Sequence, residues 1–250
     1  MDLLSYLLLL AGFIVFIAAL VHGCIGVGFP MIATPLIALI SDVQTAIVLT
    51  LIPTILINIV SIRSEGAVFT AIRKHLPLAL LAMLGSALGT WLLITINSPW
   101  FSIVLAIAIF AYLVIDKVNI QSIWILKYPR ISRLVFGTSA GVVGGLTNVM
   151  APVLIMYTIE AKFSRQDTIQ ALNVSFMLGK LIQIVVFLYY GLFSIQVISA
   201  SSVFVLVSAA ALYLGIHIRK RIDAALFIRL LRLFLLFLAV ALILQFILSN

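Results

Sequence analysis

Lys180 is the residue whose position most directly suggests chemistry, because it lies near the middle of an apolar run from Thr168 to Tyr190. The ammonium is too far from either end of that run to reach water comfortably. A charge at the centre of a membrane helix costs about 2.5–3.5 kcal/mol on insertion scales, so it usually has a partner or faces a cavity. Asn173 and Gln183 fall on nearly the same helical face as Lys180. This polar stripe is a candidate binding surface.

An anion is the partner that the sequence favours for Lys180. The alternatives are that the lysine pairs with a structural acid or is neutral. No acidic residue lies in the centre of any apolar run, so an anionic substrate is the more economical partner.

Two stretches rich in glycine and proline interrupt the apolar runs: GCIGVGFPMIATP at residues 23–35 and AGVVGGLTNVMAP at residues 140–152. Irregular backbone at membrane depth persists only where protein or a watery cavity satisfies its polar groups. Helix N-termini at such breaks present N–H groups and a positive dipole end, which suit an anion. The alternative is that the glycines allow close helix packing. The candidate binding residues at the breaks are Gly26, Gly28, Thr34, Gly144, Gly145, Thr147 and Asn148.

The composition identifies the elements that must position these residues. Hydrophobic residues make up 65% of the 250-residue chain and charged residues 9%, and the mean hydropathy is +1.35. Several uncharged runs approach the length of about 20 residues that spans a bilayer as a helix. The sequence therefore predicts an all-α integral membrane protein. The net charge of +8 comes from short loops between apolar runs and is a topology signal, not a nucleic-acid footprint.

The chain reads as two copies of one unit, residues 1–126 and residues 127–250. The alignment pairs Gly28 with Gly145, Pro35 with Pro152, Gly66 with Gly191 and Gly89 with Gly215. Each half has about five apolar segments, of which the second is short, so we expect eight to ten spans. The helix of the first half that corresponds to the Lys180 helix carries further polar candidates on one face, Thr50 and Asn58, together with Thr54 and Ser61.

Loop charges predict the orientation, because cytoplasmic loops carry an excess of lysine and arginine. The loops near Asp42, Ser98 and Gly191 have no basic residue and belong outside. Both termini then lie outside and the connector inside, so the halves are inverted relative to each other, a frequent plan of secondary transporters. The basic residues assigned to cytoplasmic loops are Arg63, Arg73, Lys74, Lys117, Lys127, Arg130, Arg133, Arg219, Lys220, Arg221 and Arg229.

Few other residues could carry chemistry. Cys24 is the only cysteine and the three histidines are scattered, so neither a metal site nor the nucleophile cluster of a membrane enzyme is predicted. No catalytic residue or cofactor is expected. His22 precedes the first break, and a bond from its ring to a backbone carbonyl is the expected role, with proton coupling as the alternative.

The two glycine-rich breaks, each followed by a proline-containing apolar helix (ATPLIAL and APVLIMY), then a polar-dotted helix and an LG-containing helix, resemble the sulfite exporter TauE/SafE family. The resemblance covers essentially the whole chain. It implies a secondary carrier in the cell membrane for small anions such as sulfite, sulfonates or sulfoacetate, with a proton or sodium ion as a possible coupling ion. Family members often have G-x-G-G at the breaks, whereas Phe29-Pro30 and Leu146-Thr147-Asn148 stand here. An anion channel and a structural membrane protein are the alternatives.

Overall fold

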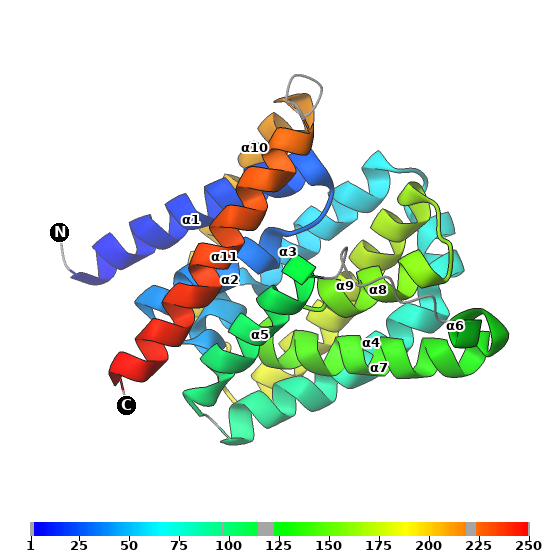
Figure 1. Ribbon diagram of the computed structural model, residues 1–250. Coiled ribbons are helices and arrows are strands. Elements are labelled where there is room, and N and C mark those ends of the chain that lie inside the picture. Colours follow the sequence, from blue (N-terminus) through cyan, green and yellow to red (C-terminus); the bar gives the residue numbers. More distant parts are fainter. Residues whose placement is uncertain (1–2, 97, 115–122, 219–223, 250) are drawn as a thin grey trace.

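The computed structural model describes residues 3–96, 98–114, 123–218 and 224–249, and within these ranges it is helical without strands (Figure 1). The expectation of an all-α protein is confirmed. The helices are α1 (Leu3–Ile25), α2 (Phe29–Ile40), α3 (Val43–Ser64), α4 (Val68–Ile96), α5 (Trp100–Val114), α6 (Ile123–Lys127), α7 (Pro129–Thr147), α8 (Ala151–Glu160), α9 (Arg165–Tyr189), α10 (Ile195–Ile218) and α11 (Ala224–Ser249).

Six of the described helices are long and apolar enough to cross a bilayer: α1, α3, α4, α9, α10 and α11. The apolar helices α2, α5 and α8 are shorter. The expectation of eight to ten spans therefore stays a prediction. The short second segment of each half is present, since α2 has 12 residues and α8 has 10.

Several basic residues that the sequence analysis assigned to loops lie in helices instead. Arg73 and Lys74 are near the start of α4, and Arg130 and Arg133 are in the first turns of α7. Lysine and arginine are good helix formers, so a helix continues past its apolar part until a stronger stop signal ends it. Arg63, Lys127 and Arg229 likewise lie in helices, at the end of α3, at the end of α6 and in α11. Lys117, Arg219, Lys220 and Arg221 lie outside the described residues.

Each break combines a residue in the left-handed conformation with a proline that starts the next helix. Gly26 follows α1 with φ 97°, and Asn148 follows α7 with φ 67°. Pro30 and Pro152 then lie in the first turns of α2 and α8. A left-handed residue ends a helix by satisfying its last carbonyls, and proline suits a first turn because it lacks an N–H.

The structure shifts the alignment of the two breaks. Gly26 and Asn148 are separated by the same number of residues as Pro30 and Pro152. The N-cap residues of α3 and α9, Asp42 and Ser164, have that separation too. The alignment by residue type, which paired Gly28 with Gly145 and Pro35 with Pro152, joins residues in different structural positions. Gly28 caps α2 and Pro35 lies inside it, whereas Gly145 lies inside α7 and Pro152 starts α8.

Glycines bring α4 and α7 into backbone contact. Gly85 and Gly89 of α4 face Gly141 and Gly145 of α7. A Cβ atom on Gly141 would lie 2.0 Å from the carbonyl oxygen of Ala82, which is too close for any side chain. Close packing, the alternative that the sequence left open for the glycines, is thus the role that Gly141 and Gly145 have in α7.

A matching contact joins α1 to α10. Gly23 and Gly215 face each other, and a Cβ atom on Gly23 would lie 2.7 Å from the carbonyl oxygen of Leu212. A Cβ atom on Gly215 would lie 2.3 Å from the carbonyl oxygen of Leu20. The first helix of each half therefore packs against the fourth helix of the other half.

The long helices α3 and α9 lie in the middle of the molecule. Figure 1 shows α1, α10 and α11 on one side and α4, α6 and α7 on the other. Across the molecule, α10 packs on α3, α3 packs on α9, and α9 packs on α4. This order brings both breaks against the two central helices.

We expect Gly85→Ala to destabilise the protein by about 1–3 kcal/mol, the usual cost of overpacking. The new methyl would lie 2.2 Å from the carbonyl oxygen of Thr138 and would force α4 and α7 apart. The measurement is thermal unfolding in detergent. Unfolding is monitored by the reaction of Cys24 with a fluorogenic maleimide, since this buried cysteine is the only one in the chain.

Gly12→Ala is the matched control, because its new methyl would meet the Phe204 ring at an ordinary 3.6 Å. Its unfolding midpoint should not fall below that of the wild type, because alanine favours a helix more than glycine does. Equal midpoints for both variants would show that the α4–α7 contact does not depend on glycine.

Candidate functional site

The Lys180 side chain is completely buried in the protein interior. Its ammonium donates to Asn148 Oδ1 at the second break and to Gln183 Oε1, one turn further along α9. Both acceptors are neutral amide oxygens. Among the described residues, no carboxylate lies within ion-pair distance of Lys180. The amine is therefore held in place by hydrogen bonds, with no described carboxylate close enough to compensate a positive charge there.

Asn148 connects Lys180 to the first half of the chain. Its Nδ2 donates to Thr34 Oγ1 of α2 at 2.7 Å and to Thr50 Oγ1 of α3 at 3.0 Å. Thr50 donates its own hydroxyl hydrogen to the Ala46 carbonyl at 2.8 Å, so it can only accept from Asn148. These bonds fix the amide so that its oxygen faces Lys180.

Gln183 connects Lys180 to α4 and α7 in the same way. Its Nε2 donates to Thr90 Oγ1 at 2.9 Å and to the Gly145 carbonyl at 3.4 Å. Thr90 is completely buried. We call the resulting group the Lys180 cluster; its members are Lys180, Asn148, Gln183, Thr34, Thr50 and Thr90.

The Lys180 cluster has spare hydrogen-bond donors. A lysine ammonium has three N–H donors, and the two amide acceptors use two of them. Thr34 and Thr90 accept hydrogen bonds, and within the described part of the chain neither hydroxyl has an acceptor for its own hydrogen. One N–H and two O–H groups next to an uncompensated positive charge suit a small oxyanion.

The first break has a separate set of polar contacts. Asn173 Nδ2 donates to the Gly26 carbonyl at 3.0 Å. The backbone N–H of Phe29 donates to His22 Nδ1 at 3.2 Å, and His22 Nε2 lies 2.7 Å from Ser61 Oγ. Since Nδ1 accepts, the ring hydrogen is on Nε2 and is donated to Ser61. The expected carbonyl partner of His22 is therefore wrong; the ring caps the start of α2 instead.

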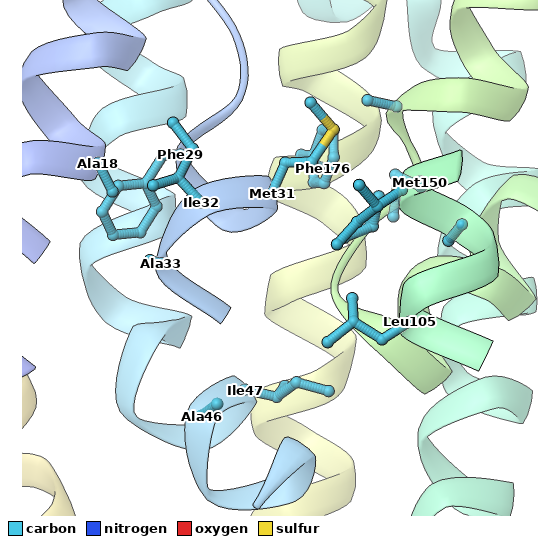
Figure 2. Packing of buried hydrophobic residues seen from close by; sticks show 14 of the residues in the cluster. Ala18, Phe29, Met31, Ile32, Ala33, Ala46, Ile47, Leu105, Met150 and Phe176 are labelled. Carbon is cyan, nitrogen blue, oxygen red and sulfur yellow. The ribbon is translucent and has the colours of Figure 1, made fainter. Parts of the chain in front are cut away.

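Apolar side chains lie between the two breaks. Phe176 lies between Asn173 and Lys180 in α9, and Figure 2 shows it beside Met31 of α2, with Met150 of the second break nearby. All three belong to one buried hydrophobic cluster. These apolar residues separate the two polar contacts of α9. Lys180 contacts the second break, and Asn173 contacts the first.

Other candidate residues at the breaks serve the backbone. Gly28 caps α2 with φ 112°. The Thr147 hydroxyl donates to the Val143 carbonyl at 2.7 Å and accepts from the Val149 N–H at 3.2 Å. Gly144 lies against Met150, whose Cε would be 2.6 Å from an added Cβ.

Asn58 lies two turns beyond Thr50 on the same face of α3. It is 1% exposed, and its Nδ2 has no hydrogen-bond partner among the described residues.

Thr90 is the one member of the Lys180 cluster that the sequence analysis did not propose. Its only sequence signal is its place directly after Gly89 in the LGT triplet of an apolar helix.

A family model described as sulfite exporter TauE/SafE matches residues 11–242, which is nearly the whole chain. The chain matches no curated protein and no solved structure. The match agrees with the six described helices that are long and apolar enough to cross a membrane. The family consists of transporters and not of enzymes. The chain is therefore a multi-pass membrane protein that belongs to the sulfite exporter TauE/SafE family.

Proposed function

We propose that this protein is a secondary transporter for a small sulfur-containing or organic anion of the sulfite, sulfonate or sulfoacetate type. The anion binds at the Lys180 cluster and crosses by alternating access. The observation that carries the proposal is the completely buried ammonium of Lys180, whose two acceptors are neutral amides. An exporter family for sulfite is consistent with such a ligand.

The energetics favour an anionic ligand over a structural role for Lys180. Burying an ion costs several kcal/mol, which two neutral hydrogen bonds offset only in part. A bound anion would add the missing counter-charge in a region of low dielectric, where ionic attraction is strong. The hydroxyls of Thr34 and Thr90 would direct the anion oxygens. The ligand thus completes the site, and the empty site is the less stable state.

The paths of the two central helices support the inverted arrangement of residues 1–126 and 127–250. Along α3, Thr50 contacts the second break and the later Ser61 contacts His22 before the first break. Along α9 the order is reversed, because Asn173 contacts the first break and the later Lys180 contacts the second. This antiparallel course of α3 and α9 is what an inverted repeat requires.

The first helix of each half packs against the fourth helix of the other half, which gives a further basis for alternating access. The moving bodies would be α1 with α10 and α4 with α7, each made of helices from both halves, and they would rock around a fixed site. In this scheme both termini lie on the non-cytoplasmic side of the cell membrane, which the loop charges favour. A proton or a sodium ion would couple the movement to an ion gradient.

We expect Lys180→Met to lower uptake of radiolabelled sulfoacetate into proteoliposomes by at least about tenfold. Removal of a charge-assisted contact costs about 1.5–3 kcal/mol, and 1.4 kcal/mol corresponds to about tenfold in affinity. Wild-type uptake should saturate with substrate concentration, as a carrier requires.

Lys162→Met is the matched control, because Lys162 is exposed in the connection between α8 and α9. It should transport as the wild type does. Equal uptake by Lys180→Met and the wild type would contradict the assignment of Lys180, and conductance without saturation would indicate a channel.

We expect Asn148→Asp to abolish most sulfoacetate binding, whereas Asn148→Gly should retain part of it. Aspartate would place a carboxylate where the amide oxygen faces Lys180, so the positive charge would be neutralised within the protein. Glycine removes the amide but keeps the left-handed backbone. Isothermal titration calorimetry in detergent measures both affinities.

The predicted order of affinity is wild type, then Asn148→Gly, then Asn148→Asp, with the aspartate variant at least about tenfold below the wild type. Binding by Asn148→Asp as tight as by the wild type would mean that the Lys180 charge does not provide the affinity.

A further inference from the structure

A cavity of about 330 Å³ lies at one end of the helix bundle. The α2–α3 connection, the end of α4, the start of α5 and the end of α11 line it; the residues used below are Ala38, Asp42, Leu93, Ser98, Ser102 and Gln245. Figure 1 shows the start of α5 and the end of α11 at the same lower left edge of the view. The cavity is separate from the Lys180 cluster.

Two lining residues lie one helical turn from members of the Lys180 cluster. Ala38 follows Thr34 by one turn of α2, and Leu93 follows Thr90 by one turn of α4. One turn of an α-helix rises about 5.4 Å. The cavity and the Lys180 cluster therefore share the walls α2 and α4 and are separated along them by a single turn.

Small or apolar side chains close the cavity on the side of the Lys180 cluster. Ala38 is 3% exposed and Leu93 is 1% exposed. Neither forms a hydrogen bond or an ion pair with its side chain, so a small movement of α2 or α4 would open the way without breaking a polar contact. We call these two residues the floor of the cavity.

The walls offer neutral polar groups to a hydrated ion. Ser98 and Ser102 have hydroxyl groups, and Gln245 also lines the cavity. The carboxylate of Asp42 keeps its negative charge but is held at the start of α3, where it accepts from the Thr45 N–H at 2.9 Å and from the Thr45 hydroxyl at 2.6 Å and where the helix dipole offsets part of that charge. Such walls can pass a small anion without holding it.

At the opposite end of the central helices, polar contacts join α9 to α4 and to the α3–α4 connection. Lys74 of α4 pairs with Asp167 of α9 at 2.5 Å. The Glu65 carbonyl, between α3 and α4, accepts from Gln170 of α9 at 3.2 Å and also from Gln166. Arg63, Arg73 and Lys74 give this end its positive charge, which marks it as cytoplasmic.

We propose that the cavity is the external vestibule through which the anion exchanges between the Lys180 cluster and the non-cytoplasmic side. The floor formed by Ala38 and Leu93 is its closed gate, and the contacts of Lys74 and Glu65 with α9 close the cytoplasmic side. The proposal rests on the proposed transport function and adds the route and the sidedness of the site.

The test uses Ser102→Cys and an anionic thiosulfonate that does not cross membranes, 2-sulfonatoethyl methanethiosulfonate. The native Cys24 is buried and does not interfere. Ser194→Cys is the matched control, because Ser194 is exposed in the connection between α9 and α10, on the same predicted side but not among the residues that line the cavity. Uptake of radiolabelled sulfoacetate into right-side-out vesicles is measured for each variant before and after labelling.

We expect the external reagent to label both cysteines. Labelling should lower uptake at least tenfold in Ser102→Cys and leave it unchanged in Ser194→Cys. Failure of the external reagent to label Ser102→Cys, or unchanged uptake after its labelling, would overturn the vestibule. Ser98→Cys, on the same wall, is tested in parallel in case Ser102→Cys does not fold.

Failure of the proposed function gives a different result. If the unlabelled wild type takes up none of the sulfite, sulfonate and sulfoacetate panel, the transport proposal is wrong. External labelling of Ser102→Cys still reports in that case whether the cavity opens to the non-cytoplasmic side, and an unlabelled Ser102→Cys would reject the vestibule as well.

Discussion

The hydrogen bond from the Lys180 ammonium to the side-chain oxygen of Asn148 is the contact on which the site depends. It holds a positive charge inside an apolar helix bundle without neutralising it. Asn148 can accept this bond because its backbone is left-handed, which ends α7 and turns the side chain toward α9. A charge buried there is costly without a counter-ion, and that cost is the physical basis of the proposed anion binding.

Glycine packing determines where this contact lies. Gly141 and Gly145 place the backbone of α7 directly against α4, so the end of α7 cannot move independently of α4. Gln183 reinforces this arrangement, because its amide bonds to both Thr90 of α4 and the carbonyl of Gly145. The glycines of the second break thus position the Lys180 cluster through helix packing, and the hydrogen-bonding side chains come from other residues.

The two breaks have similar backbones but different chemistry. At the first break, His22 and Asn173 satisfy the backbone around Gly26 without any charged side chain. Asn58 and Lys180 are separated by the same number of residues as Gly26 and Asn148, so Asn58 is the counterpart of Lys180 in the first half. Asn58 is neutral. One half of the chain therefore provides a structural break, and the other provides the buried lysine of the proposed binding site.

The sequence predicts local features well and contacts between distant helices poorly. Composition establishes the membrane class, and the three-residue spacing of Lys180 and Gln183 predicts their contact because both lie on one helix face. The bond to Asn148 could not be predicted, since it joins residues of different helices. Thr90 was missed for the same reason.

The register of the repeat shows a second limit of the sequence. Matching glycine with glycine aligned Gly28 with Gly145, but the structural equivalent of Gly26 is Asn148. Asparagine adopts the left-handed conformation more readily than most residues, so one backbone role was filled by two residue types. A comparison by residue type alone cannot detect this equivalence.

The most direct measurement is a crystal structure of the protein soaked with selenite, the selenium analogue of sulfite, with data collected at the selenium absorption edge. The account predicts an anomalous peak within hydrogen-bonding distance of the Lys180 ammonium, bordered by the hydroxyls of Thr34 and Thr90. A selenium peak only at another place in the molecule, with the Lys180 cluster unchanged, would contradict it.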